Sequence, residues 1–189
     1  MNIVFRVDAS IEMGSGHLMR CLTYSEELKQ QNHKITFICR ESEGSLIGLI
    51  KHKNYKIVTL ATVDNFQSNS LYLNWLGATQ EQDAEQTIKV IPKNIDLLIV
   101  DSYALDEIWH KQLRPYTKKI MVIDDLADRQ FDCDVLLNQN LGIQKENYKN
   151  KVPNNCELLL GCDYALLRLE FAELREKALE KRGKAKTIK

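Results

Sequence analysis

Short apolar strand patterns alternate with helical patterns along the 189 residues, and this alternation constrains the fold more than any other feature of the sequence. The strand patterns are continuously apolar, as in strands that are buried on both faces. Such strands, separated by helices, predict a Rossmann-like α/β fold in which a parallel sheet has helices on both faces. The predicted strands are residues 3–7, 35–39, 56–60, 97–100, 120–123, 135–137 and 158–160, and the predicted helices are residues 18–31, 45–51, 80–91 and 106–113.

Composition sets the class of protein and of partner. With 44% apolar and 28% charged residues, the chain has enough apolar side chains to form the core of one globular domain. The formal net charge is zero and the sequence pI is about 6.9, which argues against nucleic-acid partners and against anionic membranes. No apolar run approaches the roughly 20 residues of a membrane span, so we expect a cytoplasmic protein with a small-molecule partner.

The cysteines and glycines predict neither a metal nor a bound cofactor. The five cysteines are scattered at positions 21, 39, 133, 156 and 162, without the spacing of a zinc site, and Cys21 and Cys39 are expected to be small buried hydrophobic residues. The motif at residues 14–17 lacks the third glycine of a dinucleotide fingerprint and the ending of a P-loop.

A loop with two glycines and a histidine joins the first predicted strand to the first helix. Gly14 and Gly16 permit positive φ angles and close approach of a ligand, and the helix start beside Ser15 offers free N–H groups to an anion. His17 lies at the positive end of the helix dipole, which disfavours the imidazolium and suits a general base. Two interpretations are open: a catalytic base, or a histidine that caps the helix or packs under the sheet.

Polar side chains follow several strands, and the carboxyl ends of parallel strands meet at one edge, where ligands bind. Hydrogen-bonding groups concentrated there suit a sugar that carries hydroxyl or amide groups, although Asp and Asn also end strands as caps and turns. Adjacent Asp124 and Asp125 point to opposite faces, so we expect one in the site and one in a structural role, with no shared metal. Arg6 and Asp8 share a face and are expected to pair. The groups at the strand ends are Asp8, Ser10, Asp101, Ser102, Tyr103, Asp124, Asp125, Asn138, Gln139 and Asn140.

Two segments lie outside this pattern. Residues 61–77 are polar and predict a loop or a short irregular helix, with a surface connection anchored by Trp75 favoured over a substrate lid that includes Tyr72. Residues 171–189 predict a charged helix or linker, which makes residues 1–170 the Rossmann-like domain.

Several motifs, in order and at plausible spacing, resemble the nucleotide-sugar hydrolases of pseudaminic acid biosynthesis. Together they extend over most of the chain. They are Arg6-x-Asp8-Ala9-Ser10, Gly14-x-Gly16-His17-x-x-Arg20-Cys21-Leu22, Val100-Asp101-Ser102-Tyr103, Ile123-Asp124-Asp125, Leu136-Leu137-Asn138-Gln139-Asn140 and Gly161-x-x-Tyr164-Ala165-Leu166-Leu167-Arg168-x-x-Phe171.

The resemblance implies the N-terminal domain of a glycosyltransferase B (GT-B) fold and release of UDP from UDP-2,4-diacetamido-2,4,6-trideoxy-β-L-altropyranose. His17 would activate water for inverting attack at the anomeric carbon without a metal, with Tyr103 beside the sugar and the glycine loop near the phosphates or the anomeric centre. The substrate-binding residues it implies are Arg6, Asp8, Gly14, Ser15, Gly16, Arg20, Asp101, Tyr103, Asp125 and Asn138.

Relatives in that family continue into a second Rossmann-like domain that holds most nucleotide contacts. We therefore expect this chain to be the sugar-side half, which would need a C-terminal UDP-binding domain as a partner for turnover. Two alternatives are open, a GT-B-type sugar-nucleotide transferase domain and a non-catalytic truncated module. The sister pathway to legionaminic acid is equally open, because sugar stereochemistry depends on a few pocket contacts.

Overall fold

A computed structural model describes residues 1–184 of the chain. Within them, seven parallel strands form one sheet in the order β3-β2-β1-β4-β5-β6-β7. The predicted parallel α/β sheet is confirmed, and every predicted strand is present. The strands are β1 (Asn2–Val7), β2 (Lys34–Arg40), β3 (Lys56–Leu60), β4 (Ile95–Asp101), β5 (Thr117–Ile123), β6 (Val135–Asn138) and β7 (Glu157–Leu160).

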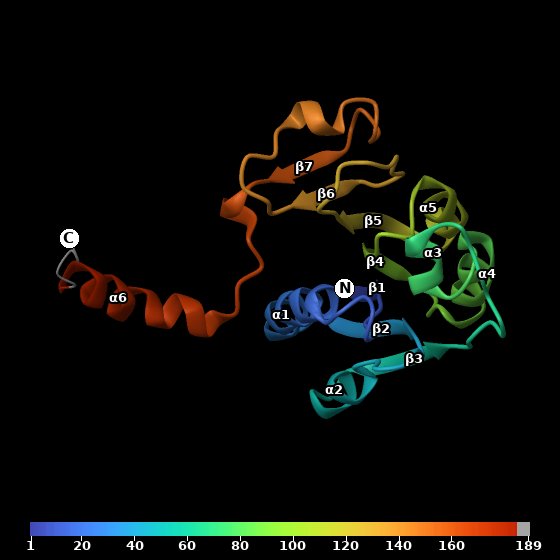
Figure 1. The fold of residues 1–189 in the computed structure, drawn as a ribbon, viewed down its shortest axis with the longest axis horizontal. Coiled ribbons are helices and arrows are strands. Elements are labelled where there is room, and N and C mark those ends of the chain that lie inside the picture. Colours follow the sequence, from blue (N-terminus) through green and yellow to red (C-terminus); the bar gives the residue numbers. More distant parts are fainter. Residues whose placement is uncertain (185–189) are drawn as a thin grey trace.

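Helices cover both faces of the sheet, as predicted. Figure 1 shows α1 (Gly16–Gln30) and α2 (Ile47–His52) on one face and α4 (Gln80–Val90) and α5 (Glu107–Leu113) on the other. The charged helix α6 (Leu169–Lys184) extends away from the sheet on the side of α1. Short 3₁₀ turns occupy Arg114–Tyr116, Lys145–Tyr148 and Cys162–Tyr164. No helix among residues 1–184 combines the length and the apolar character needed to cross a bilayer.

The core has two layers because successive strand residues point to opposite faces. Phe5 belongs to the cluster beneath α1 and α2, whereas Val4 belongs to the cluster beneath α4 and α5 with Trp109. Cys21 and Cys39 lie in the first layer as small buried side chains, which confirms their prediction.

A buried ion cluster holds β1 and β2 to α4. The Arg6 guanidinium donates to Asp8 at 2.6 Å and to Asp83 of α4 at 2.6 Å, and Arg40 donates to the same Asp83 carboxylate at 2.7 Å. Trp109 adds its indole N–H to Asp83 at 3.0 Å. Burial would raise the pKa of Asp83, but the two arginines outweigh that effect and lower it. The expected pairing of Arg6 with Asp8 is therefore confirmed.

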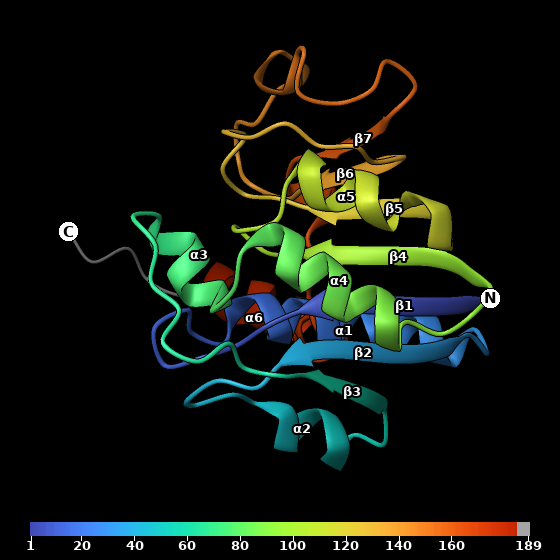
Figure 2. The ribbon, with the colours of Figure 1, turned by 90° about the vertical axis from the view of Figure 1, so that its right-hand side faces the viewer.

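The strand order reverses between β1 and β4, because the chain leaves β1 toward β2 and β3 and then returns to the other side. The connections that follow β1 and β4 consequently diverge, which leaves the region beyond their carboxyl ends open to a ligand. Helix α3 (Leu71–Leu76) lies beyond these ends, as Figure 2 shows.

Candidate active site

The loop from β1 to α1 places His17 at the edge of the sheet where the strand order reverses. Gly14 has a φ of 75°, in the left-handed region that favours glycine, whereas Gly16 is already the first residue of α1 and needs no such freedom. Ser15 is the N-cap residue, and its side chain makes no capping hydrogen bond. His17 therefore lies in the first turn of α1, as predicted.

His17 is held by Asp101, the last residue of β4. Its Nδ1 lies 2.5 Å from Asp101 Oδ1, and its ring meets the Tyr103 ring edge-on at a centroid distance of 4.4 Å. The residue is 7% exposed, but its neighbours are a carboxylate, a guanidinium and a phenol at the strand ends. His17 is thus a member of a polar cluster at the edge and is not enclosed in the apolar interior.

Arg20, one turn further along α1, fixes the carboxylate that holds His17. Its Nε and Nη2 each donate to Asp101 at 2.6 Å, in the two-pronged geometry that a guanidinium favours. Burial would raise the pKa of Asp101, but hydrogen bonds from Arg20 and His17 lower it to about 2. Asp101 is consequently ionised near neutral pH and accepts these hydrogen bonds.

Asp125 and Tyr103 extend the cluster. Arg20 Nη1 donates to Asp125 Oδ2 at 2.6 Å, and the Tyr103 hydroxyl donates to the same oxygen at 3.1 Å. Burial and the Asp125 carboxylate raise the pKa of Tyr103 to about 12, so the phenol remains a hydrogen-bond donor. Asp124 points the other way and is fully buried, where it accepts from Arg129 at 2.9 Å. The two aspartates therefore point to opposite sides, as expected, and the role of Asp125 toward a ligand stays a prediction.

The contact with Asp101 determines what the imidazole can do. When Nδ1–H donates to the carboxylate, Nε2 carries the lone pair and can accept a proton. Nε2 makes no hydrogen bond with residues 1–184 and is not among their buried unpartnered atoms, so it is open to solvent. This pairing of an oriented imidazole with a buried carboxylate is suited to general-base catalysis.

Two of the predicted substrate-binding residues are placed elsewhere, and these expectations are corrected. Arg6 is 0% exposed, with its guanidinium committed to Asp8 and Asp83, so it has no surface for a ligand. Asn138 is also 0% exposed and donates to the Tyr148 hydroxyl at 2.8 Å. Both are buried because the strand ends at which they lie are covered by neighbouring elements.

Asp8 is 3% exposed and supports the fold through Arg6 and through the backbone N–H of Arg40. The glycine-loop residues Gly14, Ser15 and Gly16 are exposed beside the cluster, within reach of a ligand. Arg20, Tyr103 and Asp125 lie with them around His17, whereas Asp101 is 1% exposed and reaches a ligand only through His17 and Arg20, which it holds. Their roles toward a ligand stay predictions.

An aromatic row that the sequence did not predict leads away from the cluster. Tyr72 of α3 lies 5.4 Å from Tyr103 between ring centroids, and Trp75 lies 5.4 Å from Tyr72. Helix α3 begins at the cap Ser70, whose side chain accepts from Leu73 N–H, and it ends at the left-handed Gly77. Residues 61–77 were predicted to be a loop or a short irregular helix, and α3 is the short helix within them. Among residues 1–184, no group of three or more His, Cys, Asp or Glu side chains is arranged to hold a metal ion.

Comparison with known proteins adds one informative match. The chain is 31% identical over 184 residues to the UDP-2,4-diacetamido-2,4,6-trideoxy-beta-L-altropyranose hydrolase of Campylobacter jejuni, which covers 96% of this chain and 57% of that relative. The resemblance drawn from the motifs is confirmed. The chain is also 27% identical over 192 residues to an uncharacterized protein of Methanocaldococcus jannaschii, covering 100% of this chain and 35% of the relative.

The chain thus spans about half the length of the Campylobacter relative and about a third of the Methanocaldococcus relative. No family model matches the chain. Among solved structures, Acinetobacter baumannii MurG aligns with a TM-score of 0.49 and 13% identity over 85% of this chain and 45% of that one. A similarity at this level identifies neither the architecture nor the function of the chain.

Proposed function

We propose that this chain is the sugar-side part of a nucleotide-sugar hydrolase that releases UDP from UDP-2,4-diacetamido-2,4,6-trideoxy-β-L-altropyranose. The observation that carries the proposal is the contact between His17 and Asp101 at the edge where the strand order reverses. The 31% identity to the Campylobacter hydrolase supports the same reaction and substrate. The remaining nucleotide contacts would come from a second domain, with the GT-B architecture that the motifs imply.

In the proposed step, His17 Nε2 takes a proton from a water molecule as the water oxygen bonds to the anomeric carbon. The bond from that carbon to the β-phosphate oxygen breaks, and UDP leaves with the electron pair. Attack opposite to the leaving group inverts the anomeric configuration. Asp101 stabilises the imidazolium that forms, and Arg20 keeps Asp101 ionised and oriented. Because UDP is a good leaving group, the proposed step uses His17 as the base and does not require a resident metal.

Hydrolysis in water enriched in ¹⁸O tests both the reaction and the bond that breaks. The chain would be incubated with the UDP-sugar, alone and mixed with the part of the Campylobacter hydrolase to which it does not align. We expect UDP in the phosphorus NMR spectrum, the opposite anomer as the first sugar product, and ¹⁸O in the sugar. Label in UDP would contradict attack at the anomeric carbon.

The matched variants are His17→Ala and His52→Ala, the latter removing a histidine at the end of α2. The proposal requires His17→Ala to abolish most UDP release while His52→Ala retains it. Equal rates in the two variants would overturn the assignment of the base. Transfer of the sugar to an added hydroxyl acceptor in preference to water would favour a sugar-nucleotide transferase instead.

A further inference from the structure

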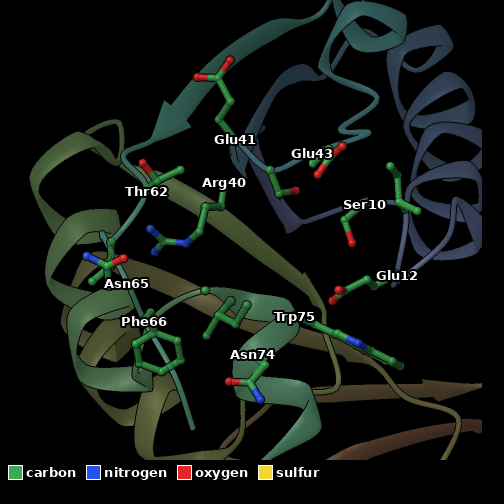
Figure 3. Close-up of a pocket in the computed structure, with 15 residues that line it drawn as sticks. Ser10, Glu12, Arg40, Glu41, Glu43, Thr62, Asn65, Phe66, Asn74 and Trp75 are labelled. Atoms are coloured by element: carbon green, nitrogen blue, oxygen red, sulfur yellow. The ribbon is translucent and has the colours of Figure 1, made fainter.

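A pocket of about 440 Å³ lies beside the candidate active site and is separate from it. Its walls come from the loop after β1, the loop after β2, the segment after β3 and helix α3, as Figure 3 shows. We propose that this pocket binds an acetamido substituent of the sugar, with Trp75 and Glu12 as its specificity-determining residues. This inference rests on the proposed function, because it assigns one part of the same substrate.

One wall of the pocket is hydrogen-bonded to the loop that positions His17. Ile11 N–H donates to the Glu43 carbonyl at 3.1 Å, and the Ser42 hydroxyl donates to the Ala9 carbonyl at 3.3 Å. These bonds join the loop after β1 to the loop after β2, so one wall of the pocket and the catalytic loop form a single unit.

The aromatic row forms a second connection between His17 and the pocket. Trp75 lines the pocket, and Tyr72 packs between Trp75 and Tyr103, whose ring contacts His17. The row therefore leads from His17 to the wall of the pocket. In the proposal, the sugar held near Nε2 of His17 lies along the row and directs one substituent into the pocket.

The free groups of the pocket match those of an acetamido group, which has one N–H donor, one carbonyl acceptor and one methyl. Trp75 is half-buried, and its Nε1–H makes no hydrogen bond with residues 1–184 and is not among their buried unpartnered atoms, so it is available to donate to a carbonyl. The Glu12 carboxylate is exposed and accepts. Phe66 and the indole face supply apolar surface for the methyl, and Figure 3 shows Phe66 across the pocket from Glu12.

The charge of the pocket argues against its occupation by the diphosphate. Three carboxylates line it, from Glu12, Glu41 and Glu43. The one arginine in its wall, Arg40, donates through its two terminal nitrogens to Asp83 and to the Ala61 carbonyl, so its charge is already paired with Asp83, and only its buried Nε has no partner among the described residues. Like charges repel, so an uncharged part of the substrate fits here and the diphosphate belongs elsewhere.

The two indole N–H signals in a ¹H–¹⁵N NMR spectrum of the chain provide a test with an internal control. Trp75 faces the pocket, whereas Trp109 is buried with its N–H bound to Asp83. The probes are free 2,4-diacetamido-2,4,6-trideoxy-L-altropyranose and 6-deoxy-L-altropyranose, which has hydroxyls in place of both acetamido groups. We expect the diacetamido sugar to shift the Trp75 signal and leave the Trp109 signal unchanged, with saturation transfer to its acetyl methyls.

Two variants supply the second measurement. Trp75→Phe keeps an aromatic ring but removes the donor, and Glu12→Ala removes the acceptor of an exposed side chain that the fold does not require. Each should weaken binding of the diacetamido sugar about fivefold to tenfold, the size of one lost hydrogen bond. Tyr116→Phe, an exposed aromatic change outside this pocket, is the matched control and should bind as the unaltered chain does.

The inference is overturned if the 6-deoxy sugar shifts Trp75 equally, if no shift appears up to the solubility limit, or if both variants bind like the control. Sugar binding and UDP release are measured separately, so the two proposals can fail independently. A Trp75 shift without UDP release would contradict the hydrolase proposal alone, and UDP release without the shift would contradict the pocket alone.

Discussion

His17 and Asp101 are 84 positions apart in the sequence, yet His17 Nδ1 lies 2.5 Å from Asp101 Oδ1. They meet because β1 and β4 are adjacent parallel strands, with Val7 paired to Asp101 at their carboxyl ends. The loop after β1 then returns the histidine over the end of β4. The carboxylate of Asp101, the last residue of β4, thereby orients the imidazole.

Replacing Asp101 by Asn should remove the activity while leaving the fold in place. The Asn amide can donate to Nδ1, which would put the ring proton on Nε2, the atom that must accept from water. We expect kcat for UDP release to fall on the order of a hundredfold to a thousandfold, with a smaller change in KM. Steady-state kinetics would check this, with Asp128→Asn, an exposed aspartate, as the control. A kcat within a factor of about two of the control would refute the role of Asp101.

Arg20→Lys should lower the activity although the charge is retained. An ammonium group cannot reproduce the paired bonds to Asp101 together with the bond to Asp125. We expect kcat to fall about tenfold or more, with loss of the sharp imidazole N–H signal of His17 in the proton NMR spectrum. Arg175→Lys on the exposed surface of α6 serves as the control. An unchanged His17 signal would show that Arg20 does not orient the ring.

Asp83→Asn should destabilise the fold strongly. The substitution removes the charge that Arg6 and Arg40 share in the interior, which leaves two buried guanidinium groups under-compensated. We expect the free energy of unfolding in urea to fall by about 3 to 5 kcal/mol. Lys111→Gln, which breaks the exposed pair with Glu107, should leave the unfolding midpoint unchanged. Equal midpoints for the two variants would contradict the structural role of the cluster.

His110 should make the stability of the chain sensitive to mild acid. The ring is fully buried, neither nitrogen has a partner in the part of the chain that the structure describes, and burial, with help from Arg114 and Arg129, lowers the pKa of His110 from 6.5 to about 3. Between these values the unfolded chain binds a proton that the folded chain does not, so stability falls as the pH decreases from 6.5 toward 3.

From pH 7 to pH 5, this histidine alone should reduce the free energy of unfolding by about 2 kcal/mol. Urea unfolding of the unaltered chain and of His110→Leu at both pH values would isolate the contribution, because the other titrating groups are common to the two proteins. Parallel pH dependence in both would disprove it.

The sheet was predictable because continuous apolar runs indicate strands whatever they pair with. The edge of the site was predictable for a related reason, since parallel strands end together and polar residues such as Asp101 and Asp125 follow directly. The partners within the site were not predictable, because the contact of His17 with Asp101 depends on the order of strands in the sheet. Asp83 was missed because a polar residue on a predicted helix is ordinarily assigned to the solvent side.

The Asp83 carboxylate accepts hydrogen bonds from side chains of β1, β2 and α5, so its replacement removes a hydrogen-bond partner from all three elements at once. Positions 6, 40 and 83 should therefore vary together among homologous sequences. A homologue without an acidic residue at position 83 should also lack both arginines and carry apolar side chains at all three positions.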